Sequence, residues 1–302
     1  MPRLFDAYVM VDWSAASAPK VGKDSVWIGV MKRDIRFRLT FDAFNPPTRS
    51  QGETKLREVL ADLRRRSERA LVGFDFPLGF PEGTAAALKL KRPDWRGLWD
   101  FLAANVVDKA DNTNNRFAVA SKMNRLMTDE ARPFWGAPAK DTQRWLQATK
   151  PAEHGPDLPP PLRRADLATQ GRGKPGAKAV WQLMGAGAVG GQAIVGIPAV
   201  RRMVDELGDR ATVWPFATGW RAVEAADVAD REVLAVEVYP SMLTAKPESG
   251  ETPDRAQVRA LCEYFAKLDD QGKLGALFAA PKAATEADVA AVEREEGWIL
   301  GV

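Results

Sequence analysis

The chain has 302 residues, of which 45% are hydrophobic and 27% are charged, and this is the composition of an ordinary globular protein. With one cysteine and one histidine, a single chain cannot build a disulfide framework, a Cys/His zinc site or an iron–sulfur cluster. The 43 basic and 40 acidic side chains leave a formal charge of +3, far below that of a typical basic nucleic-acid-binding arm.

The single histidine and the N-terminal residues also bear on the kind of catalysis and on the location of the protein in the cell. His154 lies between prolines and a glycine, so we expect a solvated loop residue and not a member of a catalytic triad. Residues 1–6 lack the apolar stretch of a signal peptide, and no segment approaches about 18 uninterrupted apolar residues. We therefore expect a cytoplasmic protein with no membrane partner.

The first part of the chain predicts three strands, a helix and a fourth strand. The expected strands cover residues 7–12, 25–31, 35–41 and 70–75. Residues 32–34 are short enough to join the second and third strands as a hairpin. Ser50 and Glu53 have capping-box spacing in front of an apolar stripe with helical periodicity, which predicts the helix. The fourth strand is almost wholly apolar, as expected of a strand buried on both faces.

From residue 82 to residue 230 the alternation of strands and helices stops, and the pattern becomes mostly helical. Helices are expected near residues 95–102, 117–130, 140–148 and 198–204, a long loop at 151–178, and a short strand at 212–215. No independent linker marks either end of this segment. We therefore predict one domain, residues 1–302, with a core of about 1–81 and 231–302 and an insertion of about 82–230.

The strand pattern returns at residues 233–239. Thr252 and Pro253 then begin a helix whose apolar stripe includes Cys262, so we expect a buried thiol with no chemical role. A last helix is expected to begin near Thr285. The predicted fold is α/β, a mixed five-stranded sheet flanked by helices, with the helical insertion between the fourth and fifth strands.

Two aspartates stand where apolar strands end. Asp12 follows the first strand and Asp75 follows the fourth. A structural explanation is available for each, since aspartate often caps a turn after a strand. Carboxylates are rarely buried without a partner, however, and ligands of open α/β sheets bind at the carboxyl ends of the strands. We therefore predict a shared site that binds Mg²⁺ or Mn²⁺ through oxygen ligands, as in metal-assisted phosphodiester hydrolysis.

Two further acids are candidates for the same site. Glu237 stands in the last strand between Val236 and Val238, so it is either a site residue or a solvated residue of an edge strand. Asp288 stands three residues after Thr285, so it can complete a capping box, yet an acid in the first turn of a helix can also reach a metal. The sequence leaves both alternatives open.

Residues 185–190 match the G-x-G-x-x-G pattern of dinucleotide-binding proteins, after a plausible strand at 179–183. Gly191, Gly196 and Pro198 disfavour the helix that should follow, and the next strand ends without the acid that would hold a ribose. We therefore predict no nucleotide cofactor. A glycine-rich loop near the site is favoured, with backbone N–H groups that can cradle a phosphate.

Several segments together resemble a known family. They are Val-Asp-Trp-Ser at 11–14, Gly-Phe-Asp-Phe-Pro-Leu-Gly at 73–79, Val-Glu-Val-Tyr-Pro at 236–240, the stretches at 181–185 and 196–198, and Glu-Glu-Gly-Trp at 295–298. In order and spacing they resemble the uncharacterised predicted-nuclease family with a ribonuclease H-like fold (domain of unknown function 429). The resemblance covers nearly the whole chain.

The resemblance implies a three-stranded antiparallel meander followed by two parallel strands. It also implies that acids of the first strand, the fourth strand and the last helix bind the metal, here Asp12, Asp75 and Asp288, with Glu237 as a further ligand or base. The leading hypothesis is thus a metal-dependent nuclease. The alternatives are an enzyme acting on a nucleotide or small phosphorylated metabolite, and a non-catalytic binding protein whose acids are structural.

Overall fold

Six strands form one mixed sheet, and the computed structural model describes residues 3–171 and 176–302. The strands are β1 (Ala7–Asp12), β2 (Trp27–Arg33), β3 (Leu39–Phe44), β4 (Ala70–Phe74), β5 (Ala211–Val213) and β6 (Val233–Glu237). Their order is β3-β2-β1-β4-β6-β5. The first three strands are antiparallel neighbours, whereas β1, β4, β6 and β5 run parallel. The prediction of an α/β mixed sheet is confirmed, but the sheet has six strands, because β5 adds an edge beyond β6.

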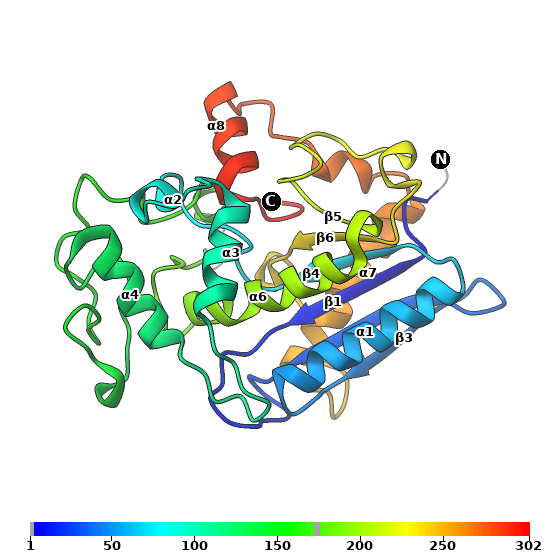
Figure 1. Ribbon diagram of the computed structural model, residues 1–302. Helices are drawn as coiled ribbons and strands as arrows, with labels where there is room; N and C mark the ends of the chain where they lie inside the picture. The colour runs from blue at the N-terminus through cyan, green and yellow to red at the C-terminus, as the bar shows by residue number, and fades with distance from the viewer. Residues whose placement is uncertain (1–2, 172–175) are drawn as a thin grey trace.

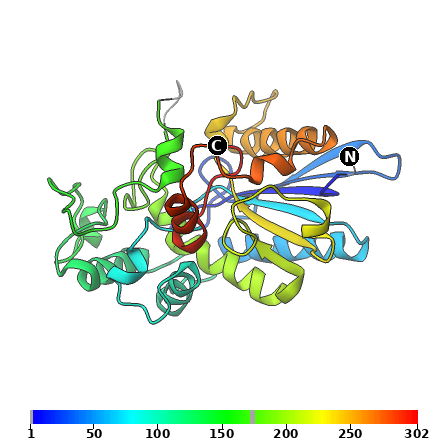
Figure 2. The ribbon, with the colours of Figure 1, turned by 90° about the horizontal axis from the view of Figure 1, so that it is seen from above.

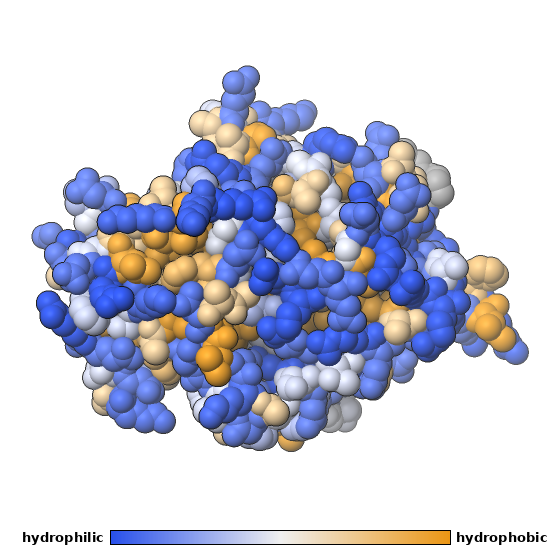
Figure 3. All heavy atoms as spheres, in the orientation of Figure 1, coloured by the Kyte–Doolittle hydropathy of each residue, from blue (hydrophilic) through white to orange (hydrophobic). Residues whose placement is uncertain are grey.

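Strand burial follows the apolar patterns of the sequence. Every residue of β1, β4 and β6 is buried, which is why these central strands are continuous apolar runs (Figure 1). Strand β3 is largely exposed and forms the other edge of the sheet. At the tip of the β2–β3 hairpin, the exposed side chains of Ile35 and Phe37 form the apolar projection on the right of Figure 3.

Helices cover both faces of the sheet. They are α1 (Arg49–Arg65), α2 (Thr84–Ala87), α3 (Trp95–Asn105), α4 (Arg116–Thr128), α5 (Arg164–Thr169), α6 (Gly190–Leu207), α7 (Pro253–Asp270) and α8 (Glu286–Ala291). Short 3₁₀ turns lie at Ala139–Asp141, Gly208–Arg210, Ala225–Val228, Pro240–Met242 and Gly275–Phe278, and a π-helical turn at Val292–Glu296. Helix α7 packs on one face, and α1 and α6 pack on the other (Figure 2).

The segment between β4 and β6 forms a lobe beside the sheet. Helices α2, α3 and α4 lie in this lobe, on the left of Figure 1. Its core is aromatic: the Trp181 ring lies 5.9 Å from Phe80 and 4.9 Å from Phe134, measured between ring centroids. The end of the same segment returns to the sheet, because α6 covers one face and β5 joins the edge. The insertion therefore supplies part of the sheet and its cover.

The β2–β3 hairpin and the start of α1 differ in detail from the prediction. The turn between the strands is longer than expected because the Asp34 carboxylate accepts hydrogen bonds from the N–H groups of Arg36 and Arg38, which moves β3 to begin at Leu39. Helix α1 is capped by Thr48 and not by Ser50. The apolar stripe of α1 is buried as predicted.

Two predicted elements of the insertion are absent from the part of the chain that the structure describes. Residues 140–148 hold only the 3₁₀ turn Ala139–Asp141, because Gln143 and Leu146 exchange backbone hydrogen bonds in a tight turn. Residues 179–183 form a turn and a single bridge between Gln182 and Trp135 in place of a strand. The expected loop at 151–178 contains α5, and residues 172–175 lie outside the described residues.

Helix α6 contradicts the expectation that its glycines and proline would prevent a helix. It runs unbroken from Gly190 to Leu207 with Pro198 inside it. The would-be Cβ of Gly196 would lie 2.5 Å from the Phe76 ring, so this glycine allows close packing. Each interior glycine costs about 1 kcal/mol of helix propensity, and burial of most of the helix outweighs that cost.

No helix within residues 3–171 and 176–302 combines the length and the apolar character that crossing a membrane requires.

Candidate functional site

Asp12 and Asp75 lie side by side where β1 and β4 end. Val11 pairs with Phe74 in parallel register, and the Asp75 N–H donates to the Val11 carbonyl at 2.9 Å. The next residues along both strands are the two aspartates, so their side chains leave the same face of the sheet. Met10, on that face, packs in the cluster that α7 covers. The sequence-predicted pair is thus brought together beneath α7.

Neither carboxylate has a hydrogen-bond donor or a cationic partner among the described residues. Asp12 is only 9% exposed. Burial, and next the charge of Asp75, raise the pKa of Asp12 well above its usual range. Burial, and next the charges of Glu237 and Asp254, raise the pKa of Asp75 to about 8. A cation or a shared proton would relieve this repulsion.

A third acid, Asp254, reaches the same place from α7, and the sequence analysis did not include it. Thr252 caps the helix, which places Asp254 in its first turn, and α7 packs across β1 and β2. One carboxylate oxygen of Asp254 accepts the Asp24 N–H at 2.8 Å, and burial raises its pKa. The sequence does contain a signal for Asp254: this acid directly follows the Thr-Pro pair that begins the helix, and the apolar stripe of that helix must cover the sheet.

Glu237 belongs to a different set of contacts. It pairs with Phe74, so it leaves the face opposite to Asp12 and Asp75. The alternative of a solvated residue on an edge strand is wrong, because Glu237 is buried and β5 lies outside β6. Its carboxylate accepts two hydrogen bonds from Arg163, at 2.7 and 2.6 Å, and one from the Leu78 N–H at 3.1 Å. Burial raises the pKa of Glu237, and the Arg163 cation opposes that effect. Glu237 is therefore committed to an ion pair and is not an open ligand or base.

Asp288 also lies apart from the aspartate pair. It forms the capping box of α8 with Thr285, and its carboxylate accepts a hydrogen bond from Arg164 at 2.7 Å. This bond and those from Thr285 lower its pKa to about 2. None of the interactions described for Asp288 involves Asp12 or Asp75. The structural alternative that the sequence left open, a helix cap, is the one observed, since α7 and not α8 crosses the central strands.

The donor set fits a hard divalent cation with few protein ligands. Within residues 3–171 and 176–302, no three His, Cys, Asp or Glu side chains converge as a preformed metal cage. Mg²⁺ needs no such cage, since it is held by one or two carboxylates and retains several waters. The buried Asp12 and the partly buried Asp75 supply two carboxylates without partners among the described residues, and Asp254 has one oxygen to which no described residue donates.

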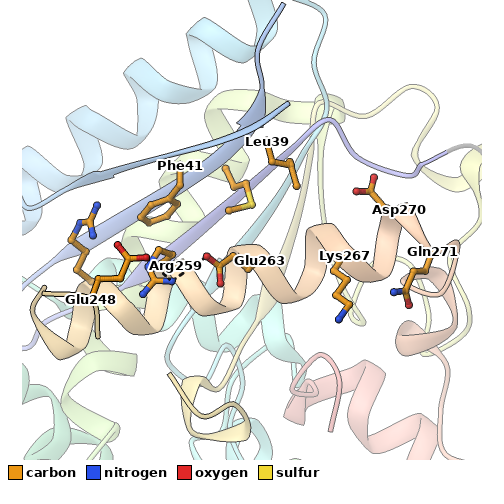
Figure 4. A pocket seen from close by; sticks show the side chains of 10 residues that line it. Leu39, Phe41, Glu248, Arg259, Glu263, Lys267, Asp270 and Gln271 are labelled. Atoms are coloured by element: carbon orange, nitrogen blue, oxygen red, sulfur yellow. Dashed lines mark hydrogen bonds and ion pairs between the residues drawn. The ribbon is translucent and has the colours of Figure 1, made fainter. Parts of the chain in front are cut away.

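A large surface groove lies elsewhere. A groove of about 720 Å³ runs between β3 and α7, and none of the three aspartates lines it (Figure 4). Several of its charges are paired with each other: Arg259 contacts Glu251 and Glu263, and Asp270 contacts Arg33. The groove therefore lies between an edge strand and a helix, apart from the three aspartates.

A comparison with protein-family models, curated proteins and solved structures finds no match for this chain. The chemistry assigned to the site follows from its own residues and their geometry.

Proposed function

We propose that this chain is a divalent-metal-dependent phosphodiester hydrolase with a ribonuclease H-like fold, as in the predicted-nuclease family that its motifs resemble. The observation that carries the proposal is the adjacent pair of carboxylates, the buried Asp12 and the partly buried Asp75, for which the described structure provides no counter-charge. The meander β3-β2-β1 followed by the parallel strand β4 supports the fold assignment.

In this proposal each acid has a defined task. Asp12 and Asp75 would hold Mg²⁺ or Mn²⁺, and Asp254, placed by α7, would orient a water molecule through its second oxygen. When bound, the cation would polarise a phosphoryl oxygen and lower the pKa of a coordinated water. Glu237 and Asp288 keep structural roles, because their carboxylates are engaged by Arg163 and Arg164.

The reaction itself is a hydrolysis that needs only water as co-reactant. A water oxygen forms the new bond to phosphorus and gives up a proton to solvent or to a nearby carboxylate, while the bond from phosphorus to the leaving oxygen breaks and that oxygen takes up a proton from solvent. Asp75, whose pKa in the metal-free protein is about 8, is suited to hold a proton near neutral pH when no cation occupies the pair.

The first test is metal binding by calorimetry. We expect the protein to bind Mg²⁺ or Mn²⁺ at millimolar concentrations or below, and we expect Asp12→Asn and Asp75→Asn each to weaken binding by about tenfold or more, because each removes a charged ligand. Asp254→Asn is expected to have a smaller effect. Asp288→Asn is the matched control and should bind like the wild type, since Asp288 caps α8.

The same variants separate the candidate substrates. Hydrolysis of single- and double-stranded DNA, of RNA and of nucleotides is measured with Mn²⁺ and Mg²⁺, with loss of at least about 100-fold expected for Asp12→Asn. Activity on nucleotides alone would replace the nuclease assignment with that of a small-substrate phosphohydrolase. A wild-type protein that binds neither cation would refute the metal-dependent function altogether.

A further inference from the structure

The outer side of β3 is an open edge of the sheet. Strand β3 is the last strand on this side, and no described residue pairs with its outer backbone groups. Helix α7 packs mainly on β1 and β2, and an open groove lies between it and β3. Edge strands are usually protected by prolines, lysines or bulges, because their free N–H and C=O groups recruit another strand. Strand β3 has no proline or lysine, pairs with β2 without a bulge, and carries one charge, that of Asp42.

The hairpin turn shows which backbone groups of β3 are free. The Asp34 N–H donates to the Arg38 carbonyl at 2.9 Å, so the backbone of Arg38 faces β2. Successive residues of an antiparallel strand point their backbone groups to opposite sides. The N–H and C=O groups of Leu39, Phe41 and Ala43 therefore point away from β2. These three residues supply the donors and acceptors that a further strand would use.

The side chains along β3 are complementary to a second copy of the same strand. When two copies pair antiparallel about a two-fold axis at Thr40, the two Thr40 side chains face each other, and Leu39 of each copy lies opposite Phe41 of the other. Arg38 of each copy lies opposite Asp42 of the other. Threonine pairs, apolar pairs and pairs of opposite charge all stabilise neighbouring strands. Leu39 and Phe41 also carry free backbone groups, so the same register forms the hydrogen bonds between the strands.

Neighbouring registers lose this complementarity. An axis at Phe41 would place Arg38 opposite Phe44, which is not a charge pair. An axis at Asp42 would place two carboxylates opposite each other, which is destabilising. An axis at Leu39 would place Asp42 opposite the hairpin turn, outside the strand. Of these four registers, only the first places both charged side chains opposite a charge of the other sign.

Both charged side chains are accessible to a second copy. The Asp42 carboxylate is exposed, and no described residue forms an ion pair or hydrogen bond with it. The Arg38 side chain is 68% exposed. Its Nε and Nη2 donate to the Asp34 carboxylate at 2.9 and 2.8 Å, whereas its Nη1 donates to no described residue. Because a guanidinium has five N–H donors, Arg38 can keep its contact with Asp34 and add one with Asp42 of the second copy.

The same arrangement covers the exposed apolar side chains of the hairpin. Ile35 and Phe37 at its tip are 95% and 76% exposed, and neighbouring apolar side chains with such exposure mark contact sites. Since the second strand runs antiparallel, each tip lies at the end of the other copy's β3, with Phe37 opposite Ala43. Leu39 and Phe41 line the groove beside α7 (Figure 4), so pairing extends this apolar surface into the second copy.

We propose that this chain forms a symmetric dimer in which two copies of β3 pair antiparallel about Thr40 and join the two six-stranded sheets into one. The partner is a second copy of this chain because the strand is complementary to itself in sequence, charge and backbone direction. A two-fold interface of this kind is closed, so association stops at two copies. The formal charge of +3 on each copy opposes association only weakly. The dimer requires no metal and does not depend on the proposed hydrolysis.

Analytical ultracentrifugation at increasing protein concentration tests the dimer. We expect the average mass of the wild type to rise from that of one copy towards that of two as the concentration passes through the micromolar range. Leu39→Pro removes one N–H group of the free edge. At the first position of the strand it leaves the hydrogen bonds with β2 in place. We expect this variant to raise the dissociation constant of the dimer by about tenfold or more.

A pair of charge variants tests the register itself. In a dimer of Arg38→Asp alone or of Asp42→Arg alone, like charges lie opposite each other, so we expect each variant to be monomeric. A mixture of the two variants restores both pairs of opposite charge, and we expect it to form a heterodimer. Arg221→Asp is the matched control, because Arg221 also forms an exposed ion pair, with Asp227, and lies in the segment that follows β5. It should dimerise like the wild type.

Each outcome decides the matter. Monomeric charge variants that combine on mixing support the dimer. A wild type that stays monomeric up to millimolar concentration overturns it, and so does a dimer that either Leu39→Pro or the charge variants leave unchanged. Folded charge variants that do not combine on mixing also overturn it. Should a variant fail to fold by circular dichroism, hydrogen exchange of the wild type decides: the Phe41 N–H must become more protected as the protein concentration rises, and unchanged protection overturns the proposal.

Discussion

Buried aspartates in this protein fall into two kinds. Asp269, which is 1% exposed, accepts hydrogen bonds from the N–H groups of Leu4 and Phe5 and from the Tyr8 hydroxyl, at 2.7 to 2.9 Å. Asp12 is buried almost as deeply and accepts none from the described residues. A structural aspartate is expected to look like Asp269, because an unsatisfied buried charge is costly. The proposed function accounts for the contrast, because a residue that binds a cation needs no partner from the protein.

The same contrast predicts how stability depends on pH in the metal-free protein. An aspartate in the unfolded chain titrates near 3.9, whereas burial, and next the charges of Glu237 and Asp254, raise the pKa of Asp75 in the folded chain to about 8. Between these values the folded state binds more protons, so the free energy of unfolding must fall as the pH rises from about 4 to about 8. We expect a loss of about 1–4 kcal/mol between pH 5 and pH 8 in urea titrations with EDTA.

Asp75→Asn provides the comparison for this pH dependence. Its stability should vary less with pH than that of the wild type, and at pH 8 it should exceed the wild type in the absence of metal. Added Mg²⁺ should restore the stability that the wild type loses at pH 8, and it should leave the stability of the variant little changed. A wild type whose stability is flat or rises over this range would show that folding does not raise the pKa of Asp75.

At the scale of elements, the sequence predicts best where one local signal decides the structure. The apolar runs locate β1, β4 and β6, and the Thr-Pro pair locates the start of α7. Predictions fail where contacts between residues far apart in the sequence determine the local structure. The glycines of α6 argue against a helix on propensity alone, and only their packing against Phe76 and the 180–183 segment shows why they are there.

The candidate site was predictable only in part, because local signals place some of its residues and distant contacts place the others. Strand ends place Asp12 and Asp75 together, because parallel register follows from the strand order. The choice between Asp254 and Asp288 depends on which helix crosses the sheet, and both stand in well-capped first turns.

At the scale of the whole molecule, one buried ion cluster joins the insertion to the sheet and to the C-terminal segment. Arg163 contacts Asp166, Glu237 and the Glu296 carbonyl, all within 3.2 Å. Arg164 adds contacts to Glu82, Asp288 and Glu296. The cluster fixes how the insertion sits on the sheet, and thereby where α6 begins relative to Asp12.

Removal of the central cation should be strongly destabilising. Arg163→Met leaves two buried carboxylates unpaired, and we expect a loss of about 3–5 kcal/mol in urea unfolding. In the double variant Arg163→Met/Glu237→Gln the loss should be smaller than the sum of the single losses, by about 1 kcal/mol or more. Arg221→Met, which breaks an exposed pair with Asp227, should leave the unfolding midpoint nearly unchanged. Additive losses would mean that the cluster is not a coupled unit.

The strand order has a consequence for how the chain reaches its structure. Met10 pairs with Gly29 and with Gly73, whereas Gly73 finds Val236 only across the whole insertion. Loop-closure entropy and contact order favour the near partners. We expect pulsed hydrogen exchange during refolding to protect β1, β2 and β4 before β6, and simultaneous protection of all four would exclude this sequence of events. Asp12 and Asp75 would then come together early in folding, and the insertion would fold around them later, when their two charges are already adjacent.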